Sequence, residues 1–201
     1  MAIKFQYNKT SMQDLNKQLS VRVRTLPTIK NKESALRMEV KKTKDIVNAL
    51  NNEYNIKIDS YSEISSLWVE FDNSLLSIDD VRLSIKKIAG VNTPVLNEII
   101  FNVKDFVIFD KPAWYLDGIE ILKDIARTAI EAEVANRKME MLEHARKKTT
   151  QKVNLYEKVQ IPGFESAILK IKRFLEDEEN LSKSSQKIVK NKQQQRKEVI
   201  E

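Results

Sequence analysis

The side chains that most often perform chemistry in proteins are scarce in this sequence. Cysteine is absent, and His144 is the single histidine among the 201 residues. No second histidine and no cysteine can therefore complete a metal site or a nucleophile–base pair. His144 lies in the polar stretch "EHARKK", where we expect a solvated side chain. We predict no catalytic residue and no metal ligand.

The sequence also lacks the usual means of holding a phosphate group. Neither GxxxxGK[ST] nor GxGxxG occurs, and three isolated glycines cannot form a phosphate-binding loop. The carboxylate run "EDEE" at 176–179 is explained most simply as a solvated helix face. We predict that the chain binds no cofactor and no nucleotide.

Positive charge is concentrated at the two ends of the chain. The net charge is +6, and residues 181–197 hold six basic residues and no acidic one. Such a tail favours an acidic partner or a solvated, frayed end. Nucleic-acid binding has only this charge to support it, because the aromatic residues expected between the basic ones are missing. The candidate partner-binding residues in the tail are Lys183, Lys187, Lys190 and Lys192.

Composition predicts long helices in place of a compact globule. Three glycines and four prolines allow few tight turns, and 32% of the residues are charged. From Met12 to Tyr54, steps of three and four residues meet an apolar side chain at ten of thirteen positions. This 3.5-residue period, held for about six heptads, is typical of a coiled-coil seam.

The last third of the sequence repeats this pattern less regularly. Apolar positions recur at three- and four-residue steps from Ile119 to Leu175, but one step falls on Arg146. The pattern predicts helix from about Tyr115 to about Lys190. We therefore expect two long helical arms, one at each end of the chain.

The middle of the chain differs from both arms. The stretch "SEISSLWVEFDNSLL" places Ile64, Leu67, Trp68, Phe71 and Leu75 at helical spacing, which indicates one short amphipathic helix. The following stretches "VRLSIKKIAGV" and "PVLNEIIFNVKDFVIFD" are rich in β-branched and aromatic residues. They predict two or three short strands.

Neither apolar seam can be buried by its own helix, so each needs a partner. We expect the two arms to pair antiparallel, which makes the fold mainly α: a two-helix coiled coil with a small α/β segment at the hinge. The alternative is a parallel homodimer of each arm. The expected divisions are 1–54 for the first arm, 55–113 for the cap, 114–190 for the second arm and 191–201 for the tail.

Each arm contains a proline, and the apolar spacing continues through both. If Tyr54 lies near Ala135, facing residues have numbers that sum to about 189, so Pro27 faces Pro162. This register predicts a shared bend in two continuous helices. In the alternative, each proline begins a separate helix. We take both prolines as candidate partner-binding positions.

Several stretches resemble one protein family. The stretches "YNKTSMQDLNKQL", "LPTIKNKESAL" and "KKTTQKVNLYEKVQIPGFESAILKIKRFLEDEE" are similar to the opening and closing arms of the D subunit of V-type and A-type ATPases and ATP synthases. The family's pattern "RRVNALE…IP" is matched by Lys152, Val153, Asn154, Glu157, Ile161 and Pro162. The segment "GVNTPVLNEIIF" also resembles the family's middle region. Pro27 departs from the family, which usually has an ordinary helix former there.

The resemblance implies a non-catalytic central rotor shaft. Its two ends would reach into a head of A and B subunits, and its base would contact the F subunit and the subunit that connects to the membrane ring. The chain would bind no nucleotide and no nucleic acid, and would be cytoplasmic and peripheral to the membrane. A basic coiled-coil scaffold, a tether or a nucleic-acid-binding coiled coil remains the alternative. No apolar run is long enough to span a membrane, and the start lacks a signal peptide's apolar stretch.

Overall fold

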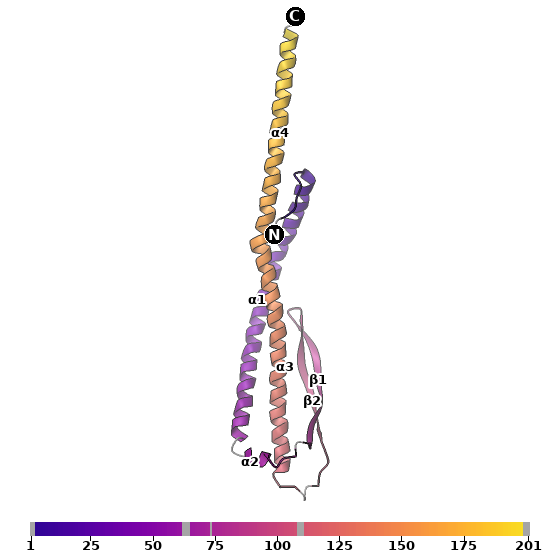
Figure 1. The fold of residues 1–201 in the computed structure, drawn as a ribbon, viewed down its shortest axis with the longest axis vertical. Coiled ribbons are helices and arrows are strands. Elements are labelled where there is room, and N and C mark those ends of the chain that lie inside the picture. Colours follow the sequence, from indigo (N-terminus) through magenta and orange to yellow (C-terminus); the bar gives the residue numbers. More distant parts are fainter. Residues whose placement is uncertain (1–2, 62–64, 73, 108–110, 199–201) are drawn as a thin grey trace. The chain divides into compact units, whose positions relative to one another are not determined.

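The computed structural model describes residues 3–61, 65–72, 74–107 and 111–198. Long helices lie at both ends of the sequence, and a β-hairpin lies between them (Figure 1). The elements in chain order are α1 (Lys9–Tyr61), α2 (Ser65–Trp68), β1 (Leu76–Ile88), β2 (Val91–Val103), α3 (Tyr115–Asn154), a π-helical turn η3 (Leu155–Gln160) and α4 (Ile161–Glu198). The mainly α fold with a small α/β middle segment is confirmed.

The chain forms two compact units, and α1 contributes to both of them. Unit 1 comprises residues 1–31 and 150–201, and unit 2 comprises residues 32–149. Each unit takes helical residues from both of the expected arms. The division of the sequence into arms, cap and tail stays a prediction. Each unit is described separately below.

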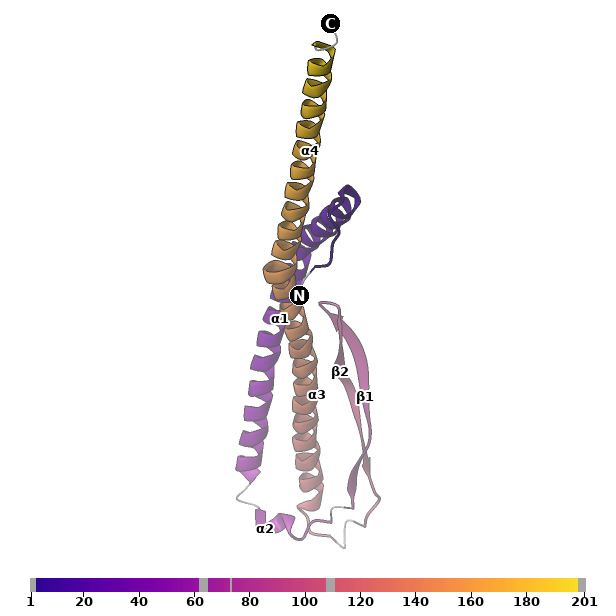
Figure 2. The ribbon, with the colours of Figure 1, turned by 45° about the horizontal axis from the view of Figure 1, so that its top comes forward.

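Unit 1 pairs the start of α1 with α4 through a small apolar core. Leu15 of α1 is buried with Phe164, Ala167 and Ile171 of α4. Lys30 of α1 also forms an ion pair with Glu157, whose side-chain oxygen lies 2.7 Å from its Nζ. These contacts show antiparallel pairing, because positions later in α1 meet positions earlier in the second helix. Beyond this core, α4 continues as an unpaired helix (Figures 1 and 2).

Unit 2 has α3 between the end of α1 and the hairpin (Figures 1 and 2). Lys57 of α1 links the two helices: its Nζ lies 2.9 Å from Asp124 and 2.8 Å from the Thr128 hydroxyl. Side-chain hydrogen bonds to Asp124, and to a smaller extent to Glu53, raise the pKa of Lys57 above its ordinary value. A second core, formed by Phe71, Leu75, Tyr115 and Ile119, closes the end of the unit near α2.

The two strands form one long antiparallel hairpin, not three short strands. Register runs from Leu76 opposite Val103 to Ile88 opposite Val91, with irregularities after Ile78 and after Arg82. The turn at Ala89 and Gly90 has positive φ at both residues, 48° and 79°. This is the backbone that a two-residue hairpin loop requires, and glycine adopts it without steric cost. Pro94 is tolerated because a two-stranded sheet has a free edge for a residue without an N–H.

The short helix expected within the stretch at 62–76 is present, but it ends earlier than the apolar spacing predicted. Helix α2 has only four residues, and Ile64 falls outside the described part of the chain. The Asp72 carboxylate accepts a hydrogen bond of 3.0 Å from the Ser74 N–H, a local turn that competes with helix. The Glu70 carbonyl accepts a hydrogen bond from the Tyr115 hydroxyl, so it is not used within a helix. Phe71 and Leu75 are nevertheless buried, as helical spacing would also have required.

The two long helices extend further than expected. Helix α1 ends at Tyr61 instead of near Tyr54, and α4 continues to Glu198, past the predicted end near Lys190. The later end of α1 shifts the pairing. In the predicted register Lys57 would face residue 132, yet it bonds residues 124 and 128, about one helical turn closer to the start of α3.

Candidate functional site

Pro162 lies in the first turn of α4, directly after the π-helical turn. The Ile161 N–H donates to the Tyr156 carbonyl, a bond that spans five residues instead of four. In an α-helix the proline ring clashes with the carbonyl four residues earlier, and the wider turn relieves that conflict. Pro27 lies inside α1. The prediction that both helices continue through their prolines is confirmed.

The prediction that Pro27 and Pro162 face each other across the two paired helices is wrong. The Arg22 Nε donates to Gln160 at 2.7 Å, and Lys30 pairs with Glu157. Pro27 lies between these two α1 positions, so it faces the turn before Gln160. Pro162 lies past Gln160, at the level of residues that precede Arg22. The error comes from anchoring the register on Tyr54, because α1 does not end there.

Arg22 organises the side chains around the π-helical turn. Its guanidinium carbon lies 4.5 Å from the centre of the Phe164 ring and 6.0 Å from the centre of the Tyr156 ring. Stacking of this kind is favourable by about 0.5–2 kcal/mol, depending on solvent exposure. Arg22 therefore occupies an apolar seam position without an unsatisfied charge.

The tail residues all lie on the unpaired part of α4. Lys183, Lys187, Lys190 and Lys192 are exposed. Lys183 forms an ion pair with Glu179, with its Nζ 2.7 Å from the carboxylate, and this bond lowers the pKa of Glu179. The structure thus presents the basic residues to solvent along one helix. Their role in binding a partner stays a prediction.

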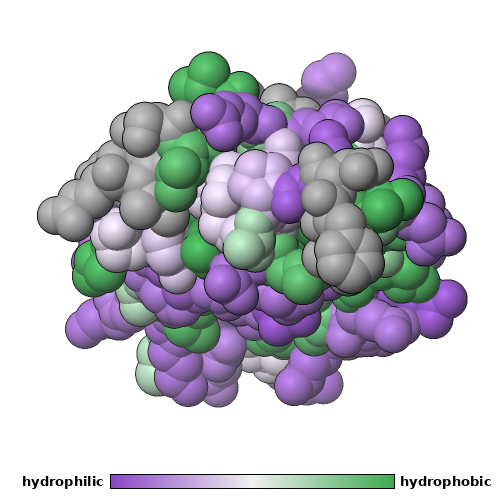
Figure 3. Space-filling view, turned by 90° about the horizontal axis from the view of Figure 1, so that it is seen from below, coloured by the Kyte–Doolittle hydropathy of each residue, from purple (hydrophilic) through white to green (hydrophobic). Residues whose placement is uncertain are grey.

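Unit 2 carries an apolar groove between the hairpin and α3. The groove encloses about 370 Å³ and is lined by Val81, Leu83, Pro94, Ala129, Ile130, Glu133, Val134 and Arg137. At the end of the unit near α2, several large apolar side chains are exposed, among them Val69 at 86%. Apolar and polar side chains are interspersed among the described residues visible on this end (Figure 3).

The sequence motifs without an assigned role can now be placed in the structure. Within the described ranges, no group of three or more histidine, cysteine, aspartate or glutamate side chains is placed to hold a metal ion. His144 and the acidic run at 176–179 are exposed. Across the described part of the chain, no helix is both long and apolar enough to cross a membrane.

Comparison with known proteins identifies the family. The family model for the D subunit of ATP synthase matches residues 11–191. This chain belongs to that family. It is 28% identical to the D subunit of the V-type ATP synthase of Chlamydia muridarum, over 98% of this chain and all of the relative. It is 31% identical to the protein of the same name from Borreliella burgdorferi, over 91% of this chain and 93% of the relative.

Two features of this D-subunit chain were missed by sequence reasoning. The first is the role of Arg22, which counted only as a polar interruption of the first seam. The second is the extended segment Ile3–Tyr7, which packs on α4 ahead of the first helix. A signal for the second was present: Ile3, Phe5 and Tyr7 alternate with polar residues, as an extended segment with one buried side requires.

Proposed function

We propose that this chain is the central rotor shaft of a V-type ATP synthase. In this role it transmits rotation between a head of A and B subunits and the ion-translocating ring in the membrane, and it catalyses nothing itself. Membership of the D-subunit family supports this proposal. The observation that carries it is the pairing of long helices from opposite ends of one chain, found separately in each unit.

A shaft needs stiffness and asymmetry. Two paired helices resist twisting better than one, and unlike faces presented in turn to equivalent catalytic interfaces bias the equilibrium of each. In unit 1, an apolar core lies on one stretch of α4 and an unpaired basic stretch follows it. The two stretches therefore offer different surfaces to a surrounding head.

Rotation also requires contacts that attract without fixing one orientation. Charge complementarity gives such attraction, because it acts at a distance and does not demand one packed geometry. We assign this role to Lys183, Lys187, Lys190 and Lys192, facing acidic residues of the head. Pro27 and Pro162 shape the helices that meet the head. The groove and α2 end of unit 2 are assigned to the F subunit and to the subunit joined to the ring.

The test measures how tightly the chain binds the A and B subunits and how fast the reconstituted complex turns over ATP. The chain with all four tail lysines changed to glutamine should fold normally, since exposed charges contribute little to stability. It should bind the A and B subunits more weakly and lower ATP turnover in the reconstituted complex, most clearly at low salt. The matched control changes four exposed lysines of unit 2: Lys41, Lys42, Lys147 and Lys148.

Two outcomes would contradict the proposal at different levels. Failure of the wild-type chain to co-purify with A and B subunits would remove the rotor function. Normal assembly with identical effects of the two lysine sets would keep the function and remove the specific role of the tail. Tight binding of the isolated chain to duplex DNA, with a steep dependence on salt, would instead favour a nucleic-acid-binding coiled coil.

A further inference from the structure

Gly163 destabilises the helix in which it lies. It lies inside a helix, where glycine costs about 1 kcal/mol relative to alanine. Its φ is ordinary, so no special backbone conformation calls for it. A Cβ atom at this position would lie 3.0 Å from Cδ1 of Ile3 and 3.8 Å from its Cγ1. The missing side chain therefore leaves room for Ile3.

Ile3 belongs to an extended segment that runs along α4. Ile3 and Phe5 pack against the buried core of unit 1. Tyr7 contacts Phe174, with ring centres 4.9 Å apart, and its ring also meets that of Phe5 at 5.4 Å. The segment thus touches α4 from Gly163 to Phe174, which is about 16 Å of helix at 1.5 Å per residue.

The length of the segment matches this path. The five residues from Ile3 to Tyr7 are joined by four Cα–Cα steps, which reach at most about 13–14 Å when fully extended. The side chains of Ile3 and Tyr7 cover the remainder. The segment must therefore be nearly straight, and its two apolar ends fix it at two separate points on α4.

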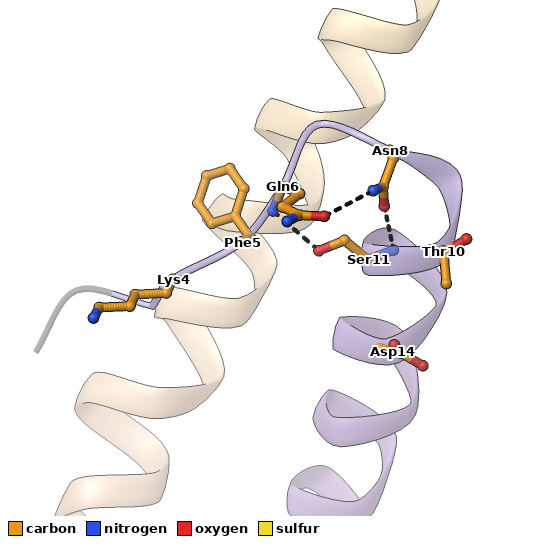
Figure 4. A pocket seen from close by; sticks show the side chains of 7 residues that line it. All are labelled: Lys4, Phe5, Gln6, Asn8, Thr10, Ser11 and Asp14. Carbon is orange, nitrogen blue, oxygen red and sulfur yellow. Dashed lines mark hydrogen bonds between the residues drawn. The ribbon is translucent and has the colours of Figure 1, made fainter.

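A hydrogen-bonded turn joins the segment to α1 (Figure 4). The Asn8 carboxamide oxygen accepts a bond of 2.7 Å from the Ser11 N–H, which caps the first turn of the helix. The Asn8 amide donates to Gln6 at 3.1 Å, and the Gln6 N–H donates to the Ser11 hydroxyl at 3.3 Å. This turn reverses the chain, so the segment and the start of α1 both lie against α4.

We propose that residues 3–7 form a strap that docks on α4, and that Gly163 is the notch that receives it. The strap holds the first turns of α1 onto α4, where a helix end would otherwise fray. It covers one side of the core made by Leu15, Phe164, Ala167 and Ile171. Gly163 is thus retained for a contact, and the neighbouring Pro162 for the path of the helix. This proposal does not depend on the rotor function.

The experiment is a double-mutant cycle on the isolated full-length chain. Gly163→Leu places a good helix former where Ile3 docks, and Ile3→Ala removes the docking side chain. Thermal melting reports stability, and trypsin cleavage after Lys4, followed by mass spectrometry, reports release of the strap. Ser166→Leu is the matched control, because Ser166 is exposed on the same helix. Cleavage after Lys190, on the unpaired part of α4, is the internal reference.

If the strap is docked, the direction in which Gly163→Leu changes Tm depends on whether Ile3 is present. In the wild-type background, Gly163→Leu should lower Tm by several degrees and speed cleavage after Lys4 at least fivefold. In the Ile3→Ala background it should raise Tm and leave the already fast cleavage unchanged. The proposal is overturned if Gly163→Leu raises Tm equally in both backgrounds, or if it affects cleavage no more than Ser166→Leu does. Because these measurements need no A or B subunit, their failure would leave the rotor proposal standing.

Discussion

The cores of the two units solve the same packing problem with different side chains. Unit 1 buries Leu15, Phe164, Ala167 and Ile171, three of which lie on one face of α4 at steps of three and four. At its end near α2, unit 2 buries Phe71, Leu75, Tyr115 and Ile119, with Trp68, Trp114 and Phe106 around them. Its helix pairing also buries Leu36 and Leu142 completely. Two paired helices mesh through a periodic seam, whereas short irregular segments need large rings to fill the space between them.

Each core also has a helical glycine whose missing side chain leaves room for a large neighbour. Gly163 admits Ile3, a side chain from a distant part of the chain, and Gly118 admits Trp114, which lies one turn earlier. In unit 1 the glycine therefore joins two segments. In unit 2 it allows the ring of Trp114, the residue directly before α3, to lie against that helix and to reach Trp68 at 5.4 Å between ring centres.

The largest effect is expected from Phe71→Ala in unit 2. Phe71 is 6% exposed and contacts the rings of Trp68, Trp114 and Tyr115. Loss of a buried phenylalanine costs about 3–5 kcal/mol, because the remaining rings cannot fill the cavity. Denaturant unfolding measures the loss, and hydrogen exchange should locate it in unit 2. Val69→Ala, at an 86% exposed site, should change stability by no more than about 0.5 kcal/mol.

A smaller effect is expected from Ile171→Ala in unit 1. Ile171 is fully buried, and its truncation should cost about 2–4 kcal/mol. Faster hydrogen exchange should appear in residues 9–20 and 161–175, leaving the hairpin unchanged. Leu181→Ala, on the unpaired part of α4, is the control and should be nearly neutral. If both Ile171→Ala and Phe71→Ala speed exchange equally throughout the chain, the two cores are not separate units.

Gly118→Ala should be destabilising although alanine favours helix. A Cβ at this position would lie 2.8 Å from Cζ3 of Trp114 and 3.0 Å from its Cε3, which is closer than carbon atoms pack. Displacement of the ring should cost about 1–3 kcal/mol, which outweighs the gain of about 1 kcal/mol in helix propensity. Tryptophan fluorescence and Tm measure the change. In a Trp114→Leu background the same substitution should stabilise the protein, and a stabilising effect in both backgrounds would contradict the packing argument.

The regular parts of the fold could be predicted from sequence, and the irregular ones could not. The seam from Met12 to Tyr54 predicted a long helix with one apolar face, because its period and length specify that structure. Antiparallel pairing was the favoured arrangement of the two arms, with a parallel dimer as the alternative, and the contacts in each unit show the antiparallel one. The register failed by about one turn, since it depends on where α1 ends, and the terminus "IKIDSY" contains no glycine or proline to mark that end. Helix α2 was overextended, because the Asp72–Ser74 turn competes with helix and periodicity does not detect it.

The sequence showed the charge of the candidate partner-binding surface on α4, but not the packing of residues 3–7 against the same helix. The basic residues of the tail are visible in the sequence and lie exposed on α4. The strap is not visible to a helical period, since it is extended and only five residues long. The notch at Gly163 depends on a contact between residues 160 positions apart, which only the folded chain reveals.

The smallest predicted effect concerns the one charged step in the second seam. Arg146 donates to both carboxylate oxygens of Glu143, at 2.7 and 2.6 Å, and both side chains are about a quarter exposed. The nearby charge of Glu33 contributes further to raising the pKa of Arg146. Unit 2 thus tolerates a charge in its helix pairing by surrounding it with carboxylates, as unit 1 tolerates Arg22 by stacking it on rings.

This arrangement makes part of the stability of unit 2 dependent on pH. The bond from Arg146 holds the pKa of Glu143 below its ordinary value of 4.5. Folding therefore favours the ionised form, and the contribution is complete above the unfolded pKa and is lost as pH falls through the folded one. Glu143→Gln should lower the free energy of unfolding by about 0.5–1 kcal/mol at pH 7. The difference from wild type should shrink steadily below about pH 4.5.

Urea unfolding of both chains at a series of pH values measures this difference. Glu179→Gln is the matched control, since Glu179 pairs with Lys183 on the exposed tail, where salt screens the pair. It should leave unfolding unchanged at physiological ionic strength. A difference between Glu143→Gln and wild type that stays constant from pH 7 to pH 3 would show that the carboxamide disturbs packing. In that case charge pairing in unit 2 would not be the counterpart of ring stacking in unit 1, and Arg146 would be held in the seam by its aliphatic stem.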